Sequence, residues 1–139
     1  MSINITEELK IRMKNDEPAA LYEYSELVRS TDEAESDKYA VLAAQLGFVP
    51  AFERVGDKYL DEGDVENAAH YFKAGAKAGI LDCSVKFAAL KIQENENEAV
   101  RELEELAQAG VRSACSALSE YYRSIGNRKQ AAYWRSLLK

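Results

Sequence analysis

Residues 51–82 read AFERVGDKYLDEGDVENAAHYFKAGAKAGILD, and this stretch carries the clearest periodic pattern in the chain. Apolar and small residues recur in it at spacings of three and four, which is the spacing of one face of an α-helix. The first set is Phe52, Val55, Gly56 and Tyr59, and the second set is Ala68, Ala69, Phe72 and Ala76. The stretch therefore predicts two consecutive helices, over 50–62 and 65–78.

The same pattern returns along the chain with a period of 31 or 32 residues. Each copy contains a glycine followed by an apolar residue, and these glycines are Gly47, Gly79 and Gly110. A second set of positions keeps the same period and consists of Ser36, Ala68, Ala99 and Ala131. Agreement between separate sets of positions identifies an internal repeat, which is the signature of a fold built by stacking one structural unit.

Local signals mark where the repeated helices begin and end. Asp32, Asn95 and Asn127 are each followed three residues later by Glu or Gln, a pattern typical of helix N-termini. The repeated glycines suit helix C-termini, where the backbone adopts a left-handed conformation. Together these signals predict helices over 5–14, 18–30, 33–46, 50–62, 65–78, 82–93, 97–109, 113–125 and 128–138.

The order of residues within 51–82 resembles a tetratricopeptide-type repeat. The resemblance rests on Ala51, Phe52, Val55, Gly56, Tyr59, the Gly63-Asp64 turn, Ala68 and Phe72. Gly79 replaces the proline that often ends a tetratricopeptide unit, so the stretch is closer to the Sel1-like subclass of these repeats. Lys86 and Glu23 depart from the pattern, because they stand where it has an apolar residue.

This resemblance implies an all-α fold, namely an α-solenoid of about four antiparallel helical hairpins with an extra N-terminal helix at 5–14. The approximate repeat units are 18–50, 51–82, 83–113 and 114–139, within a single domain that covers 1–139. In proteins of this kind the first helices of the hairpins line a concave face, which commonly binds a peptide or a partner protein.

The composition fits one packed domain of 139 residues. Hydrophobic residues make up 47% of the chain and charged residues 30%, which fits a folded core with a charged surface. No apolar run approaches the ~20 residues of a membrane span, and the first residues lack the basic and apolar segments of a secretory signal. We therefore expect a cytoplasmic protein that is a monomer or weak oligomer and has no membrane partner.

The sequence favours no catalytic, cofactor or metal site. The one histidine, His70, has no cysteine or second histidine nearby in the sequence. Cys83 and Cys115 occupy matching small-residue positions of the repeat, which favours core packing over a disulfide or a metal site. The glutamates between 94 and 105 lack the central glycine of a calcium loop, so we interpret them as a solvated helix face. We therefore expect no enzyme activity, no cofactor and no metal.

Charge is distributed unevenly along the chain. The net charge is −6, with −11 over 1–105 and +5 over 106–139. An acidic protein is not expected to bind nucleic acid generally. Tyr133 and Trp134 lie near basic residues at the C-terminal end and could stack on bases, but a terminal repeat ordinarily exposes or caps such residues. We therefore expect no nucleic-acid partner.

The resemblance places the binding surface on the first helix of each hairpin, and we take the residues one step away from the core stripe. This offset selects the candidate groove residues Leu21, Ser25, Val28, Glu53, Asp57, Leu60, Asp61, Val85, Ala89, Ile92, Ser116, Glu120 and Arg123. The mixture of apolar residues with central acidic ones predicts a partner segment that carries Lys or Arg and an apolar anchor. The alternative is that the same residues only face solvent.

The sequence thus favours a protein-protein interaction module, an adaptor or scaffold that presents a preformed surface. Two other functions remain open at this stage. One is an inhibitor or immunity-type protein that covers a single partner, and the other is a structural module that assembles with copies of itself.

Overall fold

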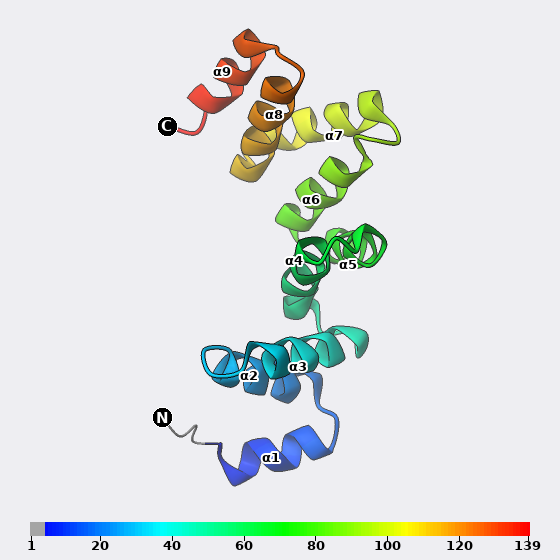
Figure 1. Cartoon of the computed structure of the whole chain (residues 1–139), viewed down its shortest axis with the longest axis vertical. Helices are drawn as coiled ribbons and strands as arrows, with labels where there is room; N and C mark the ends of the chain where they lie inside the picture. The colour runs from blue at the N-terminus through cyan, green and yellow to red at the C-terminus, as the bar shows by residue number, and fades with distance from the viewer. Residues whose placement is uncertain (1–4) are drawn as a thin grey trace. The chain divides into compact units, whose positions relative to one another are not determined.

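The computed structural model of the chain describes residues 5–139, and over that range it contains helices and turns but no β-strand (Figure 1). The helices in this range are α1 (Glu7–Lys14), α2 (Pro18–Val28), α3 (Glu33–Gln45), the short 3-10 helix η1 (Val49–Ala51), α4 (Phe52–Asp61), α5 (Val65–Lys77), α6 (Leu81–Lys91), α7 (Glu96–Gln108), α8 (Arg112–Ser124) and α9 (Arg128–Ser136). Each helix that the sequence predicts is present, and the ends agree within two residues. The all-α prediction is confirmed.

Side-chain hydrogen bonds cap the helix N-termini at the positions that the sequence predicts. The Asp32 carboxylate accepts a hydrogen bond from the backbone N–H of Glu35 at 3.1 Å. The side-chain oxygens of Asn95 and Asn127 accept the equivalent bonds at the starts of α7 and α9, at 3.3 and 3.1 Å. The Asp64 carboxylate does the same before α5 and also accepts from the Asn67 side chain, and these two bonds lower the pKa of Asp64. Each cap satisfies a backbone donor that the helix itself leaves unpaired.

The helices also end in a repeated way, on a glycine with positive φ. At Gly79 φ is 93°, and the next N–H, that of Ile80, donates back to the Gly75 carbonyl at 3.0 Å. At Gly110 φ is 97°, and the N–H of Val111 donates to the Leu106 carbonyl at 3.0 Å. A residue with a Cβ is strained in this conformation. The 31- and 32-residue spacing of the glycines is therefore the spacing of helix ends.

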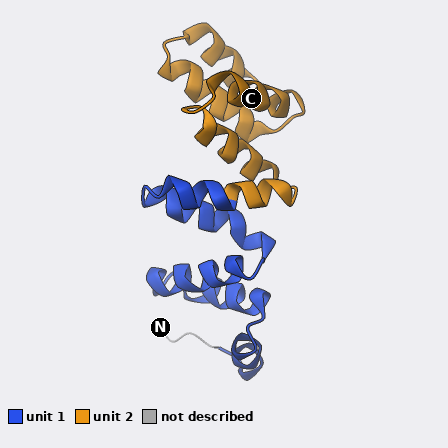
Figure 2. Cartoon of the chain, turned by 90° about the vertical axis from the view of Figure 1, so that its right-hand side faces the viewer, with its two compact units in different colours: residues 1–71 blue, residues 72–139 orange. Residues whose placement is uncertain are grey.

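The chain divides into two compact units, which we call unit 1 (1–71, described from 5) and unit 2 (72–139) (Figure 2). In unit 1, α2 packs against α1 and α3, and α3 packs against α4. In unit 2, α7 packs against α6 and α8, and α8 packs against α9. These consecutive helices are therefore neighbours within their unit, as expected for helical hairpins that cannot bury an apolar face alone.

Each unit has its own apolar core, and the two cores differ in composition. The core of unit 1 is rich in small residues and includes Leu21, Ala40, Ala43, Ala44, Ala51, Val55 and Tyr71. The core of unit 2 includes Val85, Ala88, Val100, Leu103, Ala107, Ala114, Cys115, Leu118 and Trp134. Cys83 and Cys115 are both buried and free of disulfides, so the prediction that they pack in the interior is confirmed.

Tyr59 illustrates how a repeat position contributes to packing. Its ring is half-buried and stacks on the ring of Tyr71, with the centroids 5.9 Å apart and the planes 7° from parallel. The Lys58 ammonium lies 4.6 Å from the centre of the Tyr59 ring. Tyr59 therefore packs against the core of unit 1 without being fully enclosed by it.

Replacing Tyr59 with alanine should lower the free energy of unfolding by about 2 kcal/mol, because a half-buried aromatic ring and its stacking partner are lost. Urea denaturation followed by far-UV circular dichroism measures this change. The variant Tyr59→Phe keeps the stacked ring and should lose less than about 0.5 kcal/mol. Equal losses in the two variants would show that the hydroxyl, and not the ring, stabilises this site.

Candidate functional site

Unit 1 contains a polar cleft of about 510 Å³ formed by α2, α3 and α4 together with Pro50 of η1. Its lining residues are Tyr22, Arg29, Glu33, Asp37, Pro50, Glu53, Arg54, Asp57, Lys58, Asp61 and Glu62. We call this the acidic cleft, because six of these side chains are carboxylates and three are cations, which gives a net charge of −3. A concave surface with a net charge raises the local concentration of ligands of the opposite charge.

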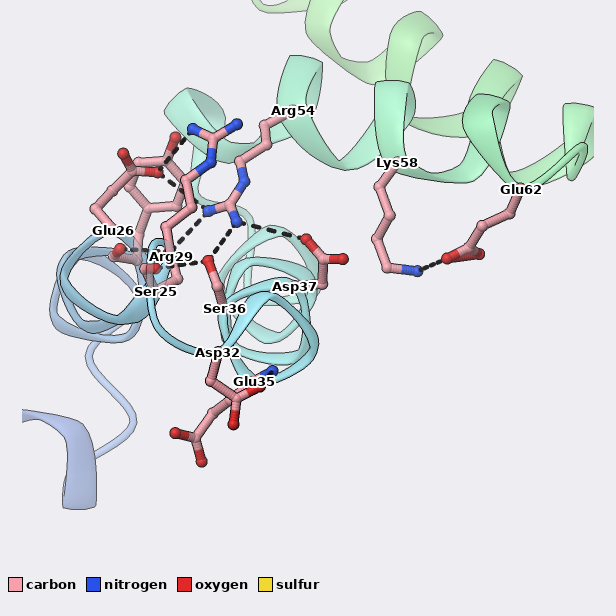
Figure 3. Close-up of polar contacts among 11 residues, drawn as sticks. Ser25, Glu26, Arg29, Asp32, Glu35, Ser36, Asp37, Arg54, Lys58 and Glu62 are labelled. Carbon is pink, nitrogen blue, oxygen red and sulfur yellow. Dashed lines mark hydrogen bonds and ion pairs between the residues drawn. The ribbon is translucent and has the colours of Figure 1, made fainter.

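Arg54 is one of the residues that line the acidic cleft, and its polar contacts link three helices (Figure 3). Its guanidinium donates to the hydroxyl oxygens of Ser25 on α2 and Ser36 on α3, at 3.0 and 2.5 Å. It also pairs with the carboxylates of Glu26 at 3.1 Å and Asp37 at 3.5 Å. The Arg54 side chain is only 13% exposed. An arginine suits this position because its planar group offers several donors in fixed directions.

The two serine hydroxyls are oriented so that their oxygens face Arg54. Ser36 donates its own hydroxyl hydrogen to the Ser25 carbonyl at 2.6 Å, and Ser25 donates to the Tyr22 carbonyl at 2.6 Å. Each hydroxyl oxygen is thereby left to accept from the guanidinium, so all these buried polar groups are paired. The Tyr22 ring lies beside the guanidinium, 5.9 Å from centroid to Cζ, and burial raises the pKa of Tyr22.

A second ion pair stands farther along α4. The Lys58 ammonium contacts the Glu62 carboxylate at 2.6 Å, one helical turn apart (Figure 3). This hydrogen bond raises the pKa of Lys58. Because the pair contains one cation and one carboxylate, the other lining residues of the acidic cleft still have a net charge of −3.

Two of the six cleft carboxylates face solvent without a partner. Glu33 and Asp61 are exposed and form no hydrogen bond or ion pair with the residues that the structure describes. Glu53 and Asp57 are half-buried, and each already interacts with other residues of the chain. Glu33 and Asp61 are therefore the carboxylates that are most available to a ligand.

The structure brings three of the predicted groove residues together in the acidic cleft. Glu53, Asp57 and Asp61 lie at successive turns of α4, and all three line the cleft. Leu60, on the same helix, is 38% exposed and does not line it. These three acidic residues of the predicted groove therefore share one cleft in unit 1, and their role in binding stays a prediction.

Four other groove residues are buried, and the expectation that they line an open surface is wrong. Leu21 is 4% exposed, Val28 is 2% exposed and Val85 is 4% exposed, and all three are core residues. Ser25 is fully buried, and its hydroxyl binds Arg54. The prediction took residues one step away from the residues expected in the core. On α2 and α6 these four residues, selected in this way, are themselves core residues.

The remaining groove residues lie in unit 2, outside the acidic cleft. Ala89 and Ile92 are half-buried, and Ile92 packs against the core of that unit. Ser116, Glu120 and Arg123 are exposed on α8. They are surface residues with no ligand assigned, and their role stays a prediction.

Arg54 and its partner Asp37 are not among the residues predicted from the sequence. One signal was present, because Ser36 occupies the repeat position that is alanine in Ala68, Ala99 and Ala131. A polar residue at a buried repeat position needs a hydrogen-bond partner. The sequence gives no indication that this partner comes from a residue 18 positions farther along the chain.

Other candidate groups are placed as follows. His70 is exposed on α5, and its ring meets the Tyr71 ring edge-on at 5.0 Å. Within residues 5–139 no three His, Cys, Asp or Glu side chains are grouped closely enough to hold a metal ion. No helix of the described part of the chain has the length and apolar character required to cross a bilayer.

Comparison with known proteins identifies the fold. No protein-family model matches the sequence, and no curated protein matches it significantly. Among solved structures, the chain is similar to a Sel1 repeat protein from Oxalobacter formigenes, with a TM-score of 0.61 and 19% sequence identity. The match covers 94% of this chain and 61% of the solved chain, so this chain spans less than two thirds of that protein's length. Together with the repeated helix caps and glycine ends, this similarity shows that the chain has a Sel1-like helical-repeat fold.

Proposed function

We propose that this protein is a non-catalytic protein-interaction module, and that the acidic cleft binds a protein segment carrying Lys or Arg and an apolar anchor. The observation that carries the proposal is the convergence of six carboxylates on one concave surface with a net charge of −3. The excess of negative charge on this surface favours a ligand that carries the opposite charge.

The interior of the cleft supports binding more than catalysis. The Arg54 network lies at the cleft, and every hydroxyl and carboxylate around its guanidinium is already paired. Such a network holds α2, α3 and α4 at fixed positions, so the surface is formed before the ligand arrives. Binding to a preformed surface therefore loses less free energy to the ordering of side chains and loops.

The rim of the cleft supplies the two kinds of contact that the proposed ligand needs. Exposed Glu33 and Asp61 attract cations, and Tyr22 and Pro50 offer apolar surface for an anchor residue. Charged rim groups mainly accelerate encounter, whereas the apolar contact adds affinity. We place the protein in the cytoplasm, in keeping with its two buried cysteines, which form no disulfide.

A charge-reversal variant in the cleft tests this proposal. The change Glu33→Lys with Asp61→Lys reverses the two exposed carboxylates and leaves Glu53 and Asp57, which have contacts of their own, unchanged. The probe is a short fluorescein-labelled peptide with several lysines and one leucine, followed by fluorescence anisotropy. We expect the variant to bind this peptide about tenfold more weakly than the unmodified protein at low salt.

The matched control is Glu8→Lys with Glu94→Lys, which makes the same change in net charge at exposed positions outside the cleft. Glu8 lies in the first turn of α1 as Glu33 does in α3, so these two substitutions remove a similar helix-dipole contribution. Binding to the control should stay near that of the unmodified protein and weaken as salt rises. Equal loss in both variants would mean that the total charge, and not the cleft, attracts the peptide.

A further inference from the structure

The last helix of the chain has the chemistry that the acidic cleft is proposed to bind. Residues 125–139 contain four cations and no acidic residue. The cations are Arg128, Lys129, Arg135 and Lys139, and all four are exposed. None of them forms an ion pair with the residues that the structure describes. This segment is therefore a concentrated positive surface on an otherwise acidic protein.

Helix α9 also exposes apolar side chains beside these cations. Its inner face buries Ala131 and Trp134, which fixes the helix on unit 2. On the outer face Tyr133 is 52% exposed and Leu137 is 47% exposed. Lys129 and Tyr133 on α9 and Leu137, its C-cap residue, follow one another at intervals of four residues, so they continue one stripe to the end of the helix. The outer face thus combines a basic residue with two apolar anchors.

We propose that α9 of one copy of this protein binds in the acidic cleft of a second copy. This inference rests on the proposed function, because it assigns the occupant of the same cleft. The cleft has a net charge of −3 and the segment 125–139 has a net charge of +4, so the two surfaces are complementary. An amphipathic helix that lies with its apolar stripe in a groove is a common mode of peptide recognition.

The geometry of such an interface determines what it assembles. The two surfaces are different patches of the chain, so the interface is heterologous, and each bound copy still presents a free cleft or a free α9. Copies then associate into a linear oligomer that lengthens as the protein concentration rises. They form a closed ring instead if the rotation from one copy to the next brings the last copy back to the first. A single helix in a cleft of about 510 Å³ makes a small contact, and small interfaces are weak.

Sedimentation velocity over a range of protein concentrations tests the proposal. At low salt the weight-average mass of the unmodified protein should rise with concentration, and at high salt it should return to that of a monomer. The cleft variant Glu33→Lys with Asp61→Lys should stay monomeric at the same concentrations. A helix variant, Arg128→Glu with Lys129→Glu, should also stay monomeric. Its new acids lie in the first turn of α9, where the helix dipole favours negative charge.

Mixing the two variants gives the decisive result. The cleft variant keeps an intact α9 and the helix variant keeps an intact cleft, so an equimolar mixture should form dimers and nothing larger. The control Glu8→Lys with Glu94→Lys should associate as the unmodified protein does. The proposal is overturned if the unmodified protein stays monomeric at every concentration, if either variant alone still associates, or if the mixture stays monomeric.

The basic peptide separates this inference from the proposed function. If the peptide binds the helix variant, whose cleft is intact, but no copy binds another, the cleft is a binding site and its occupant is a different protein. If neither the peptide nor a second copy binds, the proposed function itself fails. A fluorescent single-stranded DNA that binds the unmodified protein and not the helix variant, without self-association, would overturn the inference in favour of a nucleic-acid role for α9.

Discussion

Replacing Leu118 with alanine is expected to lower the free energy of unfolding of unit 2 by about 2–5 kcal/mol. Leu118 lies in the middle of α8 and is fully buried. It belongs to the core cluster that also contains Leu103 and Trp134. Alanine at this position loses the transfer free energy of the leucine side chain and leaves a cavity that neighbouring helices fill only in part. Because a domain of this size has about 5–15 kcal/mol of stability in total, such a loss is large.

The chain's single tryptophan makes this measurement specific to unit 2. Trp134 is the only tryptophan and lies in the same core as Leu118, so its fluorescence during urea denaturation reports on that core. The matched control is Ile125→Ala at the end of α8, where the isoleucine is 55% exposed. We expect the control to change stability by less than about 0.5 kcal/mol. Similar losses of stability in the two variants would mean that the face of α8 that carries Leu118 is not packed against the core.

Replacing Arg54 with alanine is expected to destabilise unit 1 by about 3 kcal/mol and to weaken peptide binding in the acidic cleft. The substitution removes the donors that Ser25 and Ser36 accept from, and it leaves Glu26 and Asp37 without the shared cation. Hydrogen bonds to charged groups are stronger than neutral ones, and unpaired buried oxygens carry a desolvation cost. Urea denaturation followed by far-UV circular dichroism measures the stability, and fluorescence anisotropy measures the binding.

Two further variants show whether this loss comes from the network or from the charge. Arg54→Lys keeps the positive charge but lacks the planar guanidinium with its several donors, so it should lose less stability than Arg54→Ala but still some. Arg29→Ala removes a cation from the same cleft, but Arg29 is 60% exposed and its contact with Glu26 is 3.9 Å long. Exposed ion pairs contribute little, so this control should lose less than about 0.5 kcal/mol. If Arg29→Ala is as damaging as Arg54→Ala, the buried network does not stabilise the unit.

The helices and their ends could be predicted because the signals that fix them are local. Asn95 caps α7 by bonding a backbone group three residues away, and Gly110 ends the same helix because that position needs a positive φ. Such interactions involve only a few consecutive residues, so they can be read without knowing what the helix packs against. The repeat adds confirmation, since the same local signals return at one period.

The exposure of particular residues could not be predicted in the same way. Leu21, Ser25 and Val28 form one stripe on α2, as Glu53 and Asp57 do on α4. The spacing places each set on one face of its helix, but it does not say which neighbouring helix covers that face. In the structure the stripe on α2 is buried against other helices of unit 1, whereas the stripe on α4 lines a cleft.

The sequence by itself therefore determined the all-α repeat, the helix boundaries, the burial of the cysteines and the acidic stripe of α4. Only the tertiary structure placed Arg54 under that stripe, where it joins Ser25 and Ser36 from two other helices. The physical reason is the range of the interactions. A cap or a glycine turn is satisfied within a few residues, but the partner of a buried serine can come from any segment that packing brings within hydrogen-bond distance.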